Sequence, residues 1–143
     1  MNSKTRIGLV LVGFTIWITA TLLFREIGSY FFERSVSEYW FNALSTGILY
    51  AGLSCGLMKW WRIPQQDWLQ GAICIALPGM VGEIPILYGF HQFMSNMQPE
   101  TAAKYGAFLF GGYVSLIGFA WLMSSRANSS VIADKQPSIP NIK

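Results

Sequence analysis

Residues 68–90 read WLQGAICIALPGMVGEIPILYGF, a long apolar run in which Glu83 is the only charged side chain. An α-helix rises about 1.5 Å per residue, so this run is long enough to cross the roughly 30 Å hydrocarbon core of a bilayer. A charged group at that depth costs about 3 kcal/mol on insertion scales, and an acid that remains there marks a functional site by default. Glu83 is therefore the first candidate for a functional residue.

Three further blocks of the chain, residues 7–24, 41–58 and 105–123, contain no charged residue. Hydrophobic residues make up 52% of the chain and charged residues 12%, whereas about a quarter of a soluble domain is charged. The pattern predicts an all-α, integral membrane four-helix bundle in residues 1–123, with helices at about 7–26, 41–58, 68–90 and 105–123. Residues 124–143 contain Ser, Asn and Pro with little apolar content, which predicts a disordered cytoplasmic tail.

Lysine and arginine are divided unequally between the two sides of this bundle. If the amino terminus is cytoplasmic, seven lie on the inner side and three on the outer side. The inner ones are Lys4, Arg6, Lys59, Arg62, Arg126, Lys135 and Lys143, and the outer ones are Arg25, Arg34 and Lys104. This excess follows the positive-inside rule and predicts a multi-pass protein of the cell inner (plasma) membrane with both termini cytoplasmic. The net charge of +3 therefore reflects contact with the lipid bilayer and not with nucleic acid.

Small residues are spaced in two of the blocks as they are in closely packed membrane helices. Gly52 and Gly56 form a Gly-x-x-x-Gly pair, and Gly111 and Ser115 repeat that spacing in the fourth block. Small residues four apart let two helix backbones approach each other. We expect these strips to pack the four helices together within one chain, with a homo-oligomer as the alternative use.

Prolines and glycines surround Glu83 in its helix. Pro78, Gly79 and Pro85 remove or loosen backbone hydrogen bonds, and the freed carbonyls would be additional ligands for a cation. Arg25 lies at a similar depth in the first helix, at about 27 Å from its inner end against about 22 Å for Glu83. An ion pair between Arg25 and Glu83 would keep the carboxyl ionised, provided that the first and third helices touch.

Three interpretations of Glu83 remain open. It is a proton- or cation-coupled site, or it binds a cationic solute or head group that enters from the outer side. The structural alternative is an ion pair with Arg25, or a hydrogen bond to Tyr50, Tyr113 or Ser45. Separately, Trp17 lies in the middle of the first helix, where its indole N–H needs a partner or a wet cavity.

The sequence contains little that indicates catalysis. Its single histidine, His91, and its cysteines, Cys55 and Cys74, make no zinc site. There is no glycine-rich nucleotide loop and no nucleophile elbow. We therefore expect no enzyme, no metal and no cofactor. Two functions remain: handling of a small solute or ion, including transport, and a non-catalytic accessory or assembly role in a larger membrane complex.

Several short motifs resemble those of an uncharacterised family of small four-helix bacterial integral membrane proteins. They are the stretch 21–25 (TLLFR), the stretch 30–32 (YFF), Leu77-Pro78-Gly79-Met80 with the acid at Glu83, and the region of Tyr113. The resemblance spans about residues 7–123. It implies a four-helix membrane protein in which the Pro-Gly-Met turn and the following acid are family features, and it implies no activity. Aspartate is expected at the acidic position at least as readily as the longer glutamate found here.

Overall fold

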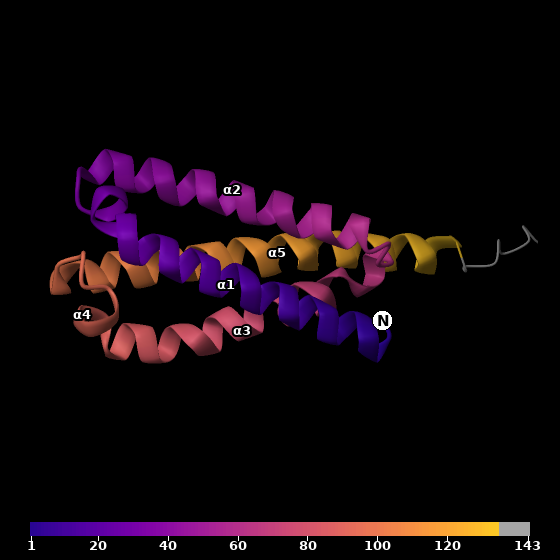
Figure 1. Cartoon of the computed structure of the whole chain (residues 1–143). Helices are drawn as coiled ribbons and strands as arrows, with labels where there is room; N and C mark the ends of the chain where they lie inside the picture. Colours follow the sequence, from indigo (N-terminus) through magenta and orange to yellow (C-terminus); the bar gives the residue numbers. More distant parts are fainter. Residues whose placement is uncertain (135–143) are drawn as a thin grey trace, which may run out of the picture.

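The chain was analysed as a computed structural model, which describes residues 1–134 (Figure 1). The described part is helical and contains no strand. Its long helices are α1 (Ser3–Phe32), α2 (Val36–Trp60), α3 (Trp68–Tyr88) and α5 (Ala102–Asp134). The connections hold the short helix α4 (Phe90–Phe93) and the single 3-10 turns η1 (Gln65–Asp67) and η2 (Pro99–Thr101).

Four segments of the structure are long and apolar enough to cross a membrane: Ser3–Phe32, Val36–Trp60, Gln65–Tyr88 and Pro99–Ser129. Their outer surfaces are strongly apolar, and the side chains of Phe41 and Ile48 are 73% and 76% exposed. Such surfaces are stable against lipid and unfavourable against water. The predicted all-α fold with four membrane helices is confirmed, and the protein is a small multi-pass membrane protein.

The first two helices are longer than predicted because polar residues cap them outside the apolar blocks. The side chain of Asn2 accepts a 2.8 Å hydrogen bond from the amide of Thr5, so α1 begins at Ser3. The hydroxyl of Ser35 accepts a 3.2 Å bond from the amide of Glu38 and starts α2 at Val36. A side chain of this kind satisfies an amide that the helix itself leaves without a partner.

The last helix also continues past its predicted end. Helix α5 runs to Asp134, so the part of the predicted tail between residues 124 and 134 is helical and the predicted boundary at Met123 is wrong. Ser124 is buried, and its hydroxyl donates a 2.6 Å bond to the carbonyl of Gln66 in η1. Residues 135–143 of the predicted tail lie outside the described residues.

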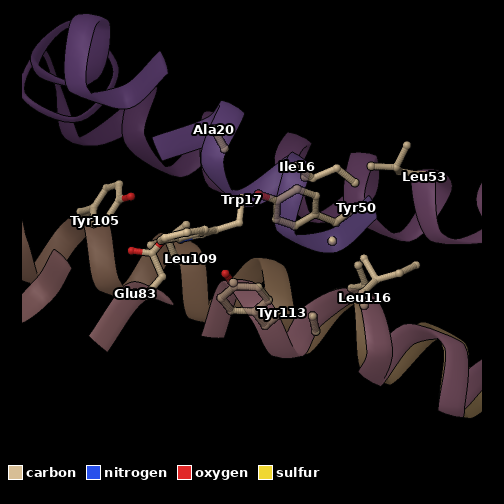
Figure 2. Close-up of a pocket in the computed structure, with 14 residues that line it drawn as sticks. Ile16, Trp17, Ala20, Tyr50, Leu53, Glu83, Tyr105, Leu109, Tyr113 and Leu116 are labelled. Atoms are coloured by element: carbon tan, nitrogen blue, oxygen red, sulfur yellow. The ribbon is translucent and has the colours of Figure 1, made fainter. Parts of the chain in front are cut away.

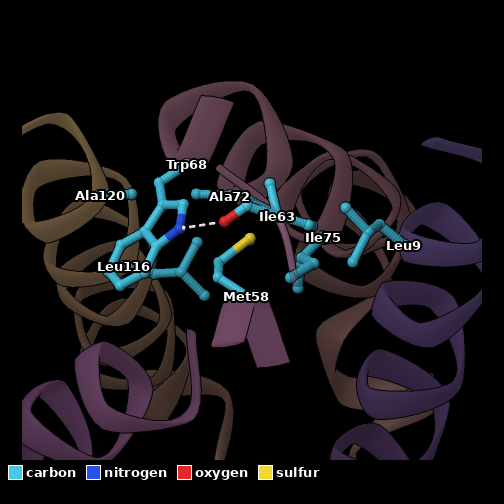
Figure 3. Packing of buried hydrophobic residues seen from close by; sticks show 9 residues of the cluster. Leu9, Met58, Ile63, Trp68, Ala72, Ile75, Leu116 and Ala120 are labelled. Atoms are coloured by element: carbon cyan, nitrogen blue, oxygen red, sulfur yellow. Dashed lines mark hydrogen bonds between the residues drawn. The ribbon is translucent and has the colours of Figure 1, made fainter. Parts of the chain in front are cut away.

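Helix α3 packs against both α1 and α5, and α2 packs mainly against α5. The α1–α3 contact is close enough that a Cβ on Gly13 would collide with the backbone of Ile75. One cluster of buried side chains lies where α2 ends and α3 begins, around Leu9, Met58 and Trp68 (Figure 3). A second cluster holds Phe24, Phe32, Phe90, Met94, Tyr105 and Phe108, with several edge-on ring pairs.

Most residues of the predicted small-residue strips make no close contact with another helix of the described chain. A Cβ on Gly52, Gly56 or Gly111 would meet no atom within 4 Å. The intramolecular packing role predicted for these three residues is therefore wrong. Ser115 does lie at the contact between α2 and α5, where a Cβ on Gly47 would come within 3.0 Å of its hydroxyl. On α2 this contact falls at Gly47 and not at the predicted Gly52 and Gly56.

Helix α3 is continuous through Pro78 and Pro85, so the two prolines do not break it. Each proline lacks an amide hydrogen, which leaves the carbonyl four residues earlier without its usual intrahelical donor. These carbonyls belong to Cys74 and Val81.

Candidate functional site

Glu83 lies on α3 among the buried residues, with 5% of its surface exposed. Its Oε1 accepts a 2.9 Å hydrogen bond from the indole Nε1 of Trp17 on α1. Its Oε2 is buried and has no hydrogen-bond partner in the part of the chain that the structure describes. Among the described residues, the uncharged indole is the one donor in hydrogen-bond geometry with the carboxyl, and the Tyr105 hydroxyl lies close enough to interact with it as well. The second oxygen can accept a hydrogen bond from a ligand.

Three tyrosines from two other helices complete the surroundings of the carboxyl. They are Tyr50 on α2 and Tyr105 and Tyr113 on α5, and all three are in electrostatic range of Glu83. Figure 2 shows the three hydroxyl groups turned toward the Trp17–Glu83 pair. Tyr105 is fully buried, and among the described residues its hydroxyl has no hydrogen-bond partner. The site therefore contains two buried polar atoms with no partner, Glu83 Oε2 and Tyr105 Oη.

Glycines on neighbouring helices hold three of these aromatic rings in place. A Cβ on Gly82 would collide with the indole ring of Trp17. A Cβ on Gly79 would collide with Tyr113, and one on Gly112 would collide with Tyr50. Each ring can lie this close to the opposing backbone only because no side chain stands in the way. The glycines of α3 and α5 thus fix the shape of the site.

A cavity of about 40 Å³ lies between the helices at this site. A water molecule needs at least about 10–15 Å³ on this scale, so the cavity has room for roughly three water-sized groups. Its lining comes from α1, α2, α3 and α5. In Figure 2, Glu83 and Tyr105 lie at one end and Leu53 and Leu116 at the other. The cavity is therefore polar at one end and apolar at the opposite end.

A second hollow of about 130 Å³ also borders Glu83. It lies between α3 and α5 and is lined by Met80, Leu87, Gly106 and Phe110 together with Tyr113. Both hollows include Glu83. Leu109 and Tyr113 also line both hollows, so the carboxyl is one of three residues at the boundary between them.

The structure brings together only some of the residues predicted for the site. Gly79 lines the cavity with Glu83, whereas Pro78 is half-buried outside the lining and Pro85 is exposed. Arg25 is exposed, and within the described part of the chain no ion pair joins it to Glu83. The alternative of an Arg25–Glu83 ion pair is therefore wrong.

Tyr105 was not identified from the sequence, although it is the most completely buried polar side chain of the site. Its position at the first turns of the fourth apolar block is typical of an interfacial tyrosine, and nothing in the sequence distinguishes it from one. Tyr50 and Tyr113 were named as hydrogen-bond partners of Glu83, and both line the cavity. Trp17 was identified as an indole in need of a partner, and Glu83 is that partner.

The arrangement has the chemistry of a cation or proton site. It offers one carboxyl group, one free carboxyl oxygen and hydroxyl oxygens that both accept and donate. No lysine or arginine lines either hollow, so a bound cation has no competitor for the carboxyl.

Comparison with known proteins gives a family and no function. No curated protein and no solved structure matched the chain. One family model matched, and the matched residues include α2, α3 and most of α5, with Glu83 and the three tyrosines. Trp17 and the 21–25 stretch precede the matched range. The resemblance to an uncharacterised family is confirmed: the chain belongs to the family of unknown function DUF5367, whose model matches residues 31–127.

Proposed function

We propose that this membrane protein handles a small cation or a proton at Glu83. The observation that carries the proposal is a buried carboxyl whose Oε2 has no partner among the described residues and which lies in the lining of a cavity. Leaving such a group without a compensating charge is unfavourable in an apolar environment. The buried carboxylate is stabilised when a ligand provides the missing positive charge.

A structural role for the carboxyl has less support. A structural acid in a membrane is normally paired with a basic side chain or surrounded by several donors. Among the described residues, Glu83 has one neutral donor in hydrogen-bond geometry, Trp17, and Arg25 is exposed. A purely structural site would be closely packed, because a cavity costs packing contacts. The cavity beside Glu83 therefore counts against a purely structural role.

The division of lysine and arginine supports an orientation with both termini in the cytoplasm, in a cell inner (plasma) membrane. In that orientation the site lies in the outer part of the membrane. A cysteine placed at Ser129, an exposed residue of α5, tests this. It stays unmodified by a membrane-impermeant thiol reagent in intact cells and reacts after lysis. Reaction in intact cells would reverse the proposed orientation. We further propose a non-enzymatic role that requires no cofactor.

Infrared difference spectroscopy of the protein in lipid nanodiscs tests the proposed site. The carboxyl band of Glu83 is identified as the one lost in Glu83→Gln. Under the proposal this band shifts when a bound cation or a proton is exchanged. A carboxyl signal that responds neither to pH nor to any added cation would contradict the proposal.

A second candidate is an accessory or assembly subunit, or a homo-oligomer. It is favoured by the open space around Gly52 and Gly56, which lie on a helix with no neighbour at these positions. Replacing Gly52 with Leu separates the two candidates. The substitution leaves cation binding at Glu83 intact, but it disrupts an assembly that packs a partner helix on α2. Unchanged mass in native detergent electrophoresis on Gly52→Leu would count against this face as the interface.

A further inference from the structure

We infer that the ligand of this site is a small primary alkylammonium ion, a positively charged –NH₃⁺ group on a short unbranched carbon chain. The inference rests on the proposed function and specifies its substrate class. Three features of the cavity support it: its free oxygen atoms, its apolar end and its size.

The oxygen atoms fit an ammonium group because each of them can accept a hydrogen bond. Glu83 Oε2 and Tyr105 Oη are both buried and unpartnered within the described chain. The hydroxyls of Tyr50 and Tyr113 are turned toward the Trp17–Glu83 pair (Figure 2). A primary ammonium has three N–H donors and no acceptor. One –NH₃⁺ would satisfy the carboxyl oxygen, the Tyr105 oxygen and one further tyrosine oxygen, with a charge-assisted bond to the carboxylate.

The opposite end of the cavity fits a carbon chain. Ile16, Leu53 and Leu116 line it away from the carboxyl (Figure 2). An inorganic cation keeps part of its hydration shell or needs five or more oxygen ligands, and an apolar end provides neither. An alkyl chain makes favourable contacts with these side chains instead.

The geometry also distinguishes a primary from a quaternary ammonium. A quaternary group has no N–H and binds to the faces of aromatic rings. Here the tyrosines turn hydroxyl oxygens toward the carboxyl, so they would recognise a ligand through hydrogen bonds to its N–H groups. The cavity of about 40 Å³ limits the ligand to a short chain. Tetramethylammonium, with its four methyl groups around a nitrogen, is too large for a cavity with room for about three water-sized groups.

The test is a binding titration of the full chain in nanodiscs with three probes, ethylammonium, tetramethylammonium and sodium, each as the chloride. Intrinsic Trp fluorescence and thermal stability report the binding. We expect saturable binding of ethylammonium and none of the other two at equal concentration. In Tyr105→Phe the dissociation constant for ethylammonium rises about tenfold, since a hydrogen bond to a charged group is lost.

Tyr88→Phe is the matched control, because Tyr88 is 97% exposed and lies outside the cavity. It removes the same hydroxyl and leaves the dissociation constant unchanged. Glu83→Gln abolishes binding, and its circular dichroism and gel-filtration profile establish that the variant is folded. Tyr105→Phe provides the same test should Glu83→Gln fail to fold.

The outcomes separate the inference from the function on which it rests. Sodium or tetramethylammonium binding as tightly as ethylammonium, with loss in Glu83→Gln, would overturn the alkylammonium inference and leave a cation site. Binding of ethylammonium that persists unchanged in Glu83→Gln would place it outside the cavity and overturn the inference. No response of the Glu83 carboxyl to any cation or to pH would overturn both.

Discussion

The indole N–H of Trp17 on α1 donates to Oε1 of Glu83 on α3, and the two residues are 66 positions apart in the chain. This bond lies within the most extensive helix–helix contact of the described bundle, between α1 and α3. It therefore links the candidate site to the packing of the first helix. A change in either residue should alter both the stability of the protein and its binding properties.

Replacing Trp17 with Phe keeps an aromatic ring and removes the N–H. We expect the free energy of unfolding to fall by about 1–3 kcal/mol, because both carboxyl oxygens then lack a donor in a buried site. Reversible unfolding by sodium dodecyl sulfate in mixed micelles measures the change. In a Glu83→Leu background the acceptor is absent, so Trp17→Phe has little further effect. An equal loss in both backgrounds would mean that the bond contributes nothing and that only the ring matters.

Glycine 82 and glycine 52 form a matched pair for a second prediction. A Cβ on Gly82 meets the ring of Trp17, whereas one on Gly52 meets nothing within 4 Å. Gly82→Ala should destabilise the protein by about 1–3 kcal/mol, the usual cost of overpacking. Gly52→Ala should be neutral or stabilise it by up to about 1 kcal/mol, because alanine favours the helix more than glycine does. Equal effects of the two substitutions in the same unfolding assay would contradict the described α1–α3 contact.

The four-helix fold was predictable because length and composition determine it. Each apolar block is as long as a membrane is thick, and a bilayer leaves a helix as the only way to satisfy the backbone. The ends of the helices were less predictable, because polar residues such as Asn2 and Ser124 set them outside the apolar blocks. Hydropathy contains no information on such caps.

The partner of Glu83 was not predictable, although both Trp17 and Glu83 were singled out. Counting residues gives the depth of Arg25 and suggests a pair with Glu83, but it does not give the face of the helix. Arg25 is eight residues after Trp17, which turns it by about 80° around α1. Trp17 consequently faces α3 while Arg25 is exposed. Close contacts such as the one between Gly13 and Ile75 determine which face of α1 meets α3. The pattern of residues in one sequence does not reveal such contacts.

Glu33 gives a third prediction, at the end of the bundle where α1 meets the start of α5. Its Oε1 accepts bonds from the amide of Gln98 at 2.7 Å and the hydroxyl of Thr101 at 2.6 Å. Glu33→Ala removes both, so the amide of Gln98 should exchange with deuterium about tenfold faster, in line with a loss of about 1.4 kcal/mol locally. Glu26→Ala, at an exposed position of α1, serves as the control and leaves the exchange unchanged. Equal exchange rates in Glu33→Ala and the wild type would contradict this bonding.

Arg62 gives the last prediction, because its backbone has a φ of 52°, the only positive value outside glycine in the described residues. It follows the end of α2, where the amide of Ile63 bonds to the carbonyl of Met58 at 2.9 Å and closes the helix. Glycine is the usual residue at such a closing position, and any other residue is disfavoured there by about 1–2 kcal/mol. Arg62→Gly should therefore raise the free energy of unfolding by about 1 kcal/mol. Arg62→Ala removes the same charge without relieving the backbone, so it should give no increase. Equal stability of the glycine and alanine variants would mean that α2 does not end in this left-handed turn.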